Sequence, residues 1–331
     1  MLHMSSPIRC ATPLTRGVAV VAVGGNALTA ETQRGTADEI AANAAQMASC
    51  LGELVAAGWQ VAVVHGNGPQ VGNLAMQQDA AEDLVPVQPL HQLCAMTQGQ
   101  LGSVLVRAVD RECGAGKAVC VVTHVGVDPQ DPAFETPTKP IGPFFDEDRA
   151  QAYAAQRGWT VAEDSGRGWR RVVASPRPES IVEMQAIRTL LEAGHVVLAA
   201  GGGGVAVDAG SLDGVDAVID KDRASAALAT AVGATELYLL TGVDCVLLDF
   251  GTPRQRPAHR MTQQEAAQHL ADGQFPAGSM GPKVEAALRF LDDGGHRAII
   301  TSVGRLAEAV AGDPTAGTSI ERAHAATRTA S

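Results

Sequence analysis

Four apolar runs, each followed within two residues by glycine, constrain the fold of this chain most strongly. A run that is apolar at successive positions is typical of a strand buried on both faces, as in a parallel sheet covered by helices. Segments with apolar residues at helical spacing lie between the runs and predict helices over 37–54 and 90–109. The chain is therefore predicted to be an α/β protein with a mostly parallel sheet. The four runs are Val18–Val23, Val61–Val64, His195–Ala200 and Leu237–Leu240.

Further elements follow from the same patterns. We predict a third strand over 119–123, helices over 179–192, 224–232 and 282–291, and a final strand over 297–302. The 17 residues at the start lack a continuous apolar core and are expected to be a disordered leader, not a signal peptide. The main domain is expected to span 18–322, with a frayed tail over 323–331.

The turns after the apolar runs are rich in glycine and asparagine. Backbone N–H groups in such turns can cradle a phosphate, and glycine permits close approach to a ligand. In open α/β sheets, ligands bind beyond the carboxyl ends of the strands, where these turns lie. The turns that predict a ligand site are Gly24-Gly25-Asn26, Gly66-Asn67-Gly68, Gly201–Gly204 and Thr241–Asp244.

Lysine is scarce and unusually placed. The chain has 25 Lys plus Arg residues, of which only four are lysine. Lys221 and Lys283 are expected in first helical turns, where the helix dipole disfavours a cation. Lys139 precedes a proline, which places it on extended backbone. Lys117 lies at the start of a strand, away from the glycine turns, and is read as a solvated charge.

Residues 128–171 differ in character from the rest of the chain. Five prolines lie between 129 and 143, and proline cannot join a central strand. A short helix near 147–156 and a polar glycine-rich turn over 164–168 follow. We interpret this segment as an excursion from the main sheet, a small protruding subdomain or lid that brings Lys139 towards the site.

Composition excludes several classes of partner. A formal net charge of −11 argues against nucleic acid and anionic membranes, and 3% aromatic residues provide little surface for base stacking. No apolar run approaches the ~20 residues that span a bilayer. The six cysteines are scattered without a CxxC pair, which favours free thiols in a reducing cytoplasm over a disulfide framework or metal site.

Backbone donors and lysines without an evident nucleophile indicate phosphoryl transfer, which depends on positioning and charge neutralisation. An anionic acceptor such as a carboxylate needs no general base. The sequence contains neither a P-loop nor a GxGxxG fingerprint, and no HExxH, GxSxG or protein-kinase motif.

The chain resembles the carbamate kinases of the amino-acid kinase superfamily. The resemblance rests on eight stretches in family order: GGNAL (24–28), HGNGPQVG (65–72), VDPQDPAFETPTKPIGPFF (127–145), GWRRVVASPRPESIVE (168–183), AAGGGGVAV (199–207), GVDAVIDKDRAS (214–225), LLTGVDCV (239–246) and GSMGPKVEAALRF (278–290). The stretch around TKPIGP is highly specific, whereas GGNA or GGGG alone is weak.

The resemblance implies a three-layer α/β/α sandwich with a mostly parallel central sheet and a small protruding lid subdomain. It implies an ATP:carbamate phosphotransferase of arginine metabolism that interconverts ATP and carbamate with carbamoyl phosphate and ADP, often in the direction of ATP synthesis. It also implies Mg²⁺ as cofactor and a cytoplasmic homodimer.

The resemblance also implies roles for individual residues. Lys139, Lys221 and Lys283 are the expected transfer-site cations, oriented by Asp220. The expected substrate and phosphate contacts are Gly24, Gly25, Asn26, Gly66, Asn67, Gly68, Gly202 and Gly203. The expected nucleotide contacts are Thr241, Gly242, Val243, Asp244, Met280 and Gly281. No metal ligand is assigned.

One departure and two alternatives accompany this interpretation. Family members often have tyrosine and asparagine after the TGVD turn, where this chain has Leu247 and Asp249, so its adenine contacts are expected to differ. The nearest alternative is another carboxylate or phosphate kinase of the superfamily, although the KFGG opening of aspartate kinases is absent. A non-catalytic nucleotide-binding sensor is the alternative from a different class.

Overall fold

The fold was analysed in a computed structural model, which describes residues 16–30, 32–164, 166–276 and 278–322. Nearly all of the expected leader (1–17) and the whole of the expected tail (323–331) lie outside the described residues. The first described strand begins at Gly17.

An eight-stranded sheet forms the centre of the described chain, in the order β14-β16-β15-β11-β1-β2-β9-β3. All neighbouring pairs are parallel except β15 with β16, which is antiparallel. The predicted mostly parallel sheet is therefore confirmed. The strands are β1 (Gly17–Val23), β2 (Trp59–His65), β3 (Ala118–Cys120), β9 (Val196–Leu198), β11 (Glu236–Thr241), β14 (Arg260–Thr262), β15 (Arg297–Ser302) and β16 (Thr318–Glu321).

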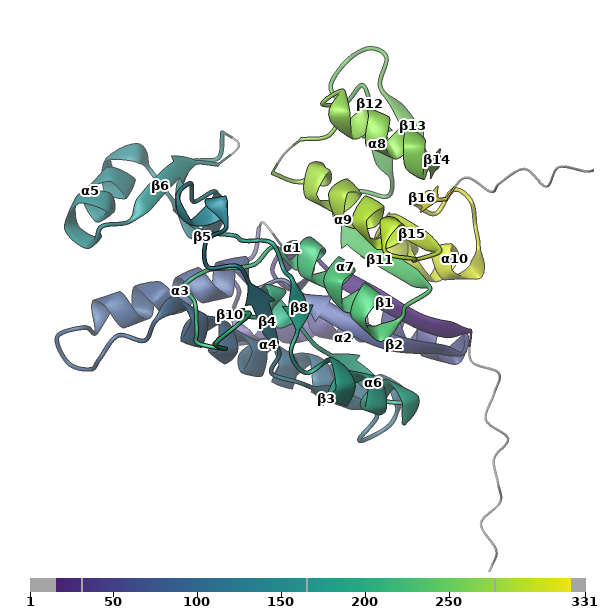
Figure 1. The fold of residues 1–331 in the computed structure, drawn as a ribbon, viewed down its shortest axis with the longest axis horizontal. Coiled ribbons are helices and arrows are strands. Elements are labelled where there is room, and N and C mark those ends of the chain that lie inside the picture. Colours follow the sequence, from purple (N-terminus) through teal and green to yellow (C-terminus); the bar gives the residue numbers. More distant parts are fainter. Residues whose placement is uncertain (1–15, 31, 165, 277, 323–331) are drawn as a thin grey trace, which may run out of the picture.

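Helices cover both faces of this sheet, which gives the α/β/α sandwich (Figure 1). Side chains of successive strand residues point to opposite faces, so Ala19 and Val21 pack against one helical layer and Val20 and Ala22 against the other. The first layer contains α2 (Ala37–Ala56), α4 (Leu90–Cys113) and α10 (Leu306–Ala311). The second contains α6 (Met184–Glu192), α7 (Lys221–Val232), α8 (Gln263–Ala271) and α9 (Met280–Asp292).

Local sequence explains where the long helices begin and end. Thr36 caps α2 with a capping box, in which its hydroxyl accepts from the Glu39 N–H and the Glu39 carboxylate accepts from the Thr36 N–H. Helix α7 ends at Gly233 in the left-handed conformation that glycine favours. None of the described helices is long and apolar enough to cross a lipid bilayer.

A smaller three-stranded antiparallel sheet, β5-β7-β6, stands apart from the central sheet. Together with α5 (Glu147–Arg157) it forms the protruding subdomain, residues 139–173, which projects from the main body in Figure 1. Its strands are β5 (Lys139–Phe145), β6 (Thr160–Glu163) and β7 (Trp169–Val173). Of the prolines in the predicted excursion, Pro140 pairs with Val172 in this small sheet and not in the central one.

The remaining elements connect these units. The short α1 (Gly25–Leu28) follows β1, and α3 (Gly68–Ala80) follows β2. A second small sheet joins β4 (His124–Val127), β8 (Ser180–Ile181) and β10 (Val205–Asp208), and a hairpin pairs β12 (Val246–Leu248) with β13 (Arg256–Ala258). Short 3₁₀ turns span η1 (Pro132–Phe134), η2 (Gly201–Gly203) and η3 (Val303–Arg305).

Several predicted boundaries were wrong. The strand expected over 119–123 ends at Cys120, because the chain leaves the central sheet there and enters β4. The helix expected from 179 begins at Met184, since Ser180 and Ile181 pair with β4. The strand at 297–302 is not the last, because β16 follows and pairs with it.

Candidate functional site

The carboxyl ends of β1, β2, β9 and β11 lie at one edge of the central sheet because these strands are parallel. Their turns are in contact. The Gly66 N–H donates to the Val23 carbonyl at 3.0 Å, and a Cβ on Gly24 would lie 3.4 Å from the carbonyl oxygen of Leu240. The structure thus brings three of the predicted glycine turns to one edge. Gly25 and Asn26 form the start of α1, in the first of these turns.

Asp220 fixes the first turn of α7 at this edge. Its carboxylate caps the helix by accepting from the N–H groups of Asp222 at 2.9 Å and Arg223 at 3.3 Å. The predicted helix over 224–232 therefore starts three residues earlier, at Lys221. The negative carboxylate also interacts favourably with the positive end of the helix dipole. This interaction offsets part of the unfavourable effect of a lysine in the same turn.

Lys139 reaches the same carboxylate from the protruding subdomain. Its Nζ lies 2.5 Å from Oδ2 of Asp220, although the two residues are 81 positions apart in the chain. Lys139 is the first residue of β5, so its backbone is extended, as expected from the proline that follows it. Asp220 thus joins the first turn of α7 to the subdomain.

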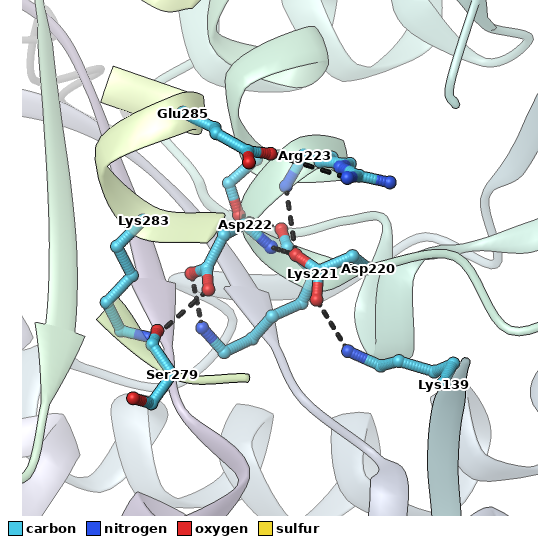
Figure 2. A network of polar contacts seen from close by, with 9 residues as sticks. Lys139, Asp220, Lys221, Asp222, Arg223, Ser279, Lys283 and Glu285 are labelled. Carbon is cyan, nitrogen blue, oxygen red and sulfur yellow. Dashed lines mark hydrogen bonds and ion pairs between the residues drawn. The ribbon is translucent and has the colours of Figure 1, made fainter. Parts of the chain in front are cut away.

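Asp222 bridges the other two lysines. Its Oδ1 lies 2.5 Å from Nζ of Lys221 and its Oδ2 lies 3.1 Å from Nζ of Lys283 on α9. Lys283 also donates to the carbonyl of Ser279 at 3.5 Å. Figure 2 shows the three lysines converging on the two aspartates from separate elements. We refer to Lys139, Asp220, Lys221, Asp222 and Lys283 as the lysine cluster.

Burial strengthens the interactions between the opposite charges of this cluster. The Asp222 side chain is 5% exposed and those of Lys221 and Lys283 are 11% exposed. Burial opposes ionisation of Asp222, yet the ammonium groups of Lys221 and Lys283 hold the pKa of that carboxyl below its ordinary value. The pKa of Asp220 is likewise lowered, against the effect of burial, by Lys139 and Lys221. Both carboxylates are therefore ionised at neutral pH.

The cluster has an excess of positive charge. Burial lowers the pKa of Lys221, while the carboxylate of Asp222 opposes that change. With three ammonium groups against two carboxylates, the cluster has one cation in excess. Such a site attracts a phosphoryl group, whose oxygens are acceptors for the same ammonium groups.

The turns at Gly66–Gly68 and Gly201–Gly204, which follow the neighbouring strands β2 and β9, pack directly on each other. A Cβ on Gly202 would lie 2.2 Å from Nδ2 of Asn67, so only glycine fits against this buried amide. The Asn67 amide donates to the hydroxyl of Thr97 at 2.9 Å. A Cβ on Gly203 would lie 2.1 Å from the carbonyl oxygen of Ile219, the residue before Asp220. Gly202 and Gly203 thus connect the Gly66–Gly68 turn to the lysine cluster.

His65 packs at the same junction and is 1% exposed. Its Nδ1 lies 3.1 Å from the carbonyl oxygen of Gly66. Burial lowers the pKa of His65 to about 4, and the hydrogen bond to Gly66 offsets only part of this effect. The imidazole is thus neutral at physiological pH, and the ring serves to pack against the glycine turns.

The pKa of His65 predicts a pH-dependent stability. The unfolded chain binds a proton near pH 6.5 and the folded chain only near pH 4, so the free energy of unfolding falls as pH decreases through this window. Between pH 7 and pH 5 the loss is about 2 kcal/mol. Urea unfolding of wild type and His65→Gln at both pH values measures it. The variant should show a smaller loss by about this amount, and equal losses in both proteins would contradict the assignment.

The predicted nucleotide contacts lie at the end of β11, in the segment that follows it, and at the start of α9. Thr241 ends β11, and Val243 is 44% exposed in the segment after it. In the described chain, no side-chain hydrogen bond or ion pair joins 241–244 to the lysine cluster. Met280 and Gly281 begin α9, two residues before the predicted helix start at Pro282, so Lys283 is the fourth helical residue and not the second.

Sequence reasoning missed Asp222 as a member of the site. An aspartate in a first helical turn is common at the surface, where it complements the helix dipole. The signal that could have identified it is the Asp-Lys-Asp spacing itself, because two aspartates beside one lysine can pair with further cations. The two other predicted lysines supply those cations.

The described residues contain no group of three or more His, Cys, Asp or Glu side chains that could hold a metal ion. The carboxylates of the cluster, Asp220 and Asp222, are each engaged by lysine. Any divalent cation here would therefore depend mainly on ligands that the substrate supplies, as Mg²⁺ often does with phosphates.

Known proteins share this fold and sequence over most of the chain. The model of the amino acid kinase family matches residues 17–302. The carbamate kinase of Pyrococcus horikoshii is 45% identical over 301 residues, which cover 88% of this chain and 96% of that protein. The carbamate kinase of Halobacterium salinarum is 45% identical over 313 residues, covering 91% and 97%.

Solved structures of carbamate kinases superpose on this chain over most of its length. Carbamate kinase from Giardia lamblia bound to citric acid superposes with a TM-score of 0.87 at 38% identity, covering 93% of this chain and 99% of that one. The same enzyme bound to AMP-PNP gives a TM-score of 0.84 at 39% identity, with the same coverage. The chain therefore belongs to the amino acid kinase family, in the group of the carbamate kinases.

Proposed function

We propose that this protein is a carbamate kinase that transfers a phosphoryl group reversibly between ATP and carbamate. The observation that supports this most directly is the sharing of Asp222 by Lys221 and Lys283, which holds two ammonium groups from separate helices beside the glycine turns. Carbamate kinases from Pyrococcus horikoshii and Halobacterium salinarum match 88% and 91% of this chain, and the Giardia relative was solved bound to AMP-PNP, an analogue of ATP.

The chemistry in the direction of ATP synthesis needs no proton transfer. A terminal phosphate oxygen of ADP attacks the phosphorus of carbamoyl phosphate, the bond between that phosphorus and the carbamoyl oxygen breaks, and carbamate leaves as an anion. The protein's task is to position both anions and to neutralise the charge on the equatorial oxygens in the transition state.

The proposed roles combine the resemblance with the contacts of the lysine cluster. Lys139, Lys221 and Lys283 contact the transferring group, and Asp220 and Asp222 hold these ammonium groups in place. Backbone donors of the turns at Gly24–Asn26 and Gly66–Gly68, with Gly202 and Gly203 behind them, orient carbamate or carbamoyl phosphate. The segment 241–244 with Met280 and Gly281 holds the nucleotide. A bound Mg²⁺ would screen the charge of the nucleotide phosphates, and no residue of this chain is assigned to it.

A coupled assay that detects ATP formed from ADP and carbamoyl phosphate tests the proposal. We expect ATP formation that requires both substrates and is abolished by EDTA and restored by Mg²⁺. Acetyl phosphate in place of carbamoyl phosphate, and acetylglutamate or aspartate as acceptors with ATP, serve as comparisons for sister enzymes. Phosphoryl transfer only in a comparison assay would indicate a sister kinase, and a well-folded protein that transfers phosphate in none of the assays would leave a nucleotide sensor.

We further propose that the enzyme is a cytoplasmic homodimer and that the protruding subdomain acts as a lid. The dimer rests on the resemblance alone, the cytoplasm also on the scattered cysteines, and the lid on the proline-rich excursion. Light scattering that gives the mass of one 34.1 kDa chain would contradict the dimer. Hydrogen exchange that is equally slow in 128–171 and in the central strands, with and without ligands, would contradict the lid.

A further inference from the structure

Helix α3 and strand β5 meet backbone to backbone at Gly72 and Gly142. A Cβ on Gly72 would lie 2.0 Å from both Cα and N of Gly142, and 2.9 Å from the carbonyl carbon of Ile141. Backbone atoms on both sides leave no flexible group that could move aside. Gly142 has a φ of +74°, a left-handed conformation that favours glycine. The contact therefore depends on the absence of a side chain at Gly72, whereas Gly142 is required by its left-handed backbone conformation.

This contact lies between two parts of the proposed site. Helix α3 begins at Gly68, in the turn proposed to orient the carbamoyl group, and Gly72 follows about one helical turn later. Strand β5 begins at Lys139, three residues before Gly142. At the start of this interface, a Cβ on Gly68 would lie 4.0 Å from the carbonyl oxygen of Pro140. The first half of β5 thus runs along the first turns of α3.

Neighbouring groups hold β5 in this position. Ile141 is fully buried in a small apolar cluster with Val71 and Val218, the latter two residues before Asp220. From the other side, Nε of Arg170 donates to the Gly142 carbonyl at 3.1 Å. At the far end of α3, Nη1 of Arg157 lies 3.5 Å from Oδ2 of Asp79. The subdomain therefore contacts α3 along most of that helix.

We propose that Gly72 and Gly142 are positioning residues for Lys139. Close approach of the two backbones sets the depth at which β5 packs on α3, and this depth sets the 2.5 Å contact between Lys139 and Asp220. This inference rests on the proposed kinase function. A methyl group at position 72 forces β5 outward and withdraws Lys139, and a displacement of about 1 Å at a reacting group can lower a rate ~10²-fold.

The variant Gly72→Ala tests this inference. In ATP formation from ADP and carbamoyl phosphate, we expect kcat to fall about 10- to 100-fold. The affinity for ADP, measured by titration calorimetry, should stay within about twofold of wild type, because the proposed nucleotide contacts lie on β11 and α9. The matched control is Gly99→Ala, a helical glycine on α4 whose added Cβ would have no atom within 4 Å. It should keep wild-type kcat.

The same substitution in the Lys139→Ala variant distinguishes a positioning role of Gly72 from a general loss of structure. In Lys139→Ala, the substitution Gly72→Ala should lower kcat by less than about twofold, because the residue through which it acts is already absent. An equal fold-change in both backgrounds, or a parallel loss of ADP affinity, would overturn the proposal. Unchanged kcat in Gly72→Ala alone would also overturn it. Wild-type protein that forms no ATP would instead refute the proposed function.

Arg170→Met gives an independent measurement if Gly72→Ala does not fold. It removes the donor to the Gly142 carbonyl without adding a group between the two backbones. We expect a smaller fall in kcat, about 3- to 10-fold, that again disappears in the Lys139→Ala background. A fall that persists in that background would count against Gly142 as a positioning residue.

Discussion

Replacing Lys221 with alanine is expected to lower the rate of ATP formation by about 10²- to 10³-fold. Loss of one preorganised charge donor to a transition state typically has this effect. The fold should survive, because Asp220 keeps Lys139 at 2.5 Å and Asp222 keeps Lys283 at 3.1 Å. No carboxylate of the cluster is then left without a cation. Steady-state kinetics together with circular dichroism measure both parts of the prediction.

Lys117→Ala is the matched control for this experiment. Lys117 lies just before β3, outside the lysine cluster, and its Nζ donates to the carbonyl of Gly194. Its removal deletes the same side chain at a position remote from the site, so kcat should remain near that of wild type. A change of less than about tenfold in Lys221→Ala would remove Lys221 from the mechanism.

Replacing Asp222 with alanine, unlike replacing Lys221, is expected to lower the free energy of unfolding strongly as well as the activity. Asp222 is 3% exposed and is the carboxylate nearest to both Lys221 and Lys283. Its removal leaves two buried ammonium groups without that partner. Breaking a buried ion pair from one side typically costs about 3–5 kcal/mol. Urea unfolding at pH 7 measures the loss in the free energy of unfolding.

Glu285→Ala provides the control for an ion pair of similar geometry at the surface. Glu285 lies 3.3 Å from Arg223, and both side chains are at least one third exposed, so the expected loss is about 1 kcal/mol or less. In the double variant Asp222→Ala, Lys283→Met, part of the lost stability should return, because one uncompensated charge is gone. A loss in Asp222→Ala no larger than in the control would show that the cluster is not electrostatically coupled.

The sequence was sufficient to predict the parallel sheet and the separate excursion. The runs at Val18–Val23 and Leu237–Leu240 are buried in β1 and β11 except at the partly buried Val18, because strands covered on both faces need apolar residues at nearly every position. The predicted end of the strand over 119–123 was wrong, because a short apolar run does not indicate which of two sheets each residue joins. Such pairing is decided by long-range contacts that no local pattern encodes.

The sequence was sufficient to predict the lysines of the candidate site but not the contacts between them. The scarcity of lysine and the expected positions at helix starts identified Lys221 and Lys283 as candidates. The proline after Lys139 predicted that the backbone of Lys139 is extended. The bridging role of Asp222 depends on α9 reaching α7 across 61 residues of chain, which local sequence does not specify. The close approach of Gly72 to Gly142 is equally invisible, because glycine in a helix and glycine in a strand each have many explanations.

The wide sequence separation within the lysine cluster has a consequence for how the protein acquires activity. Its contacts join residues 61 and 81 positions apart, and contacts of such long range form only after the entropy of closing large loops has been overcome. During synthesis on the ribosome, α9 emerges after α7 and after the subdomain. A nascent chain that has folded its first two hundred residues already has the glycine turns of β1 and β2 but neither Lys221 nor Lys283. Phosphoryl transfer therefore begins only when the last third of the domain has folded, and recovery of turnover reports completed folding.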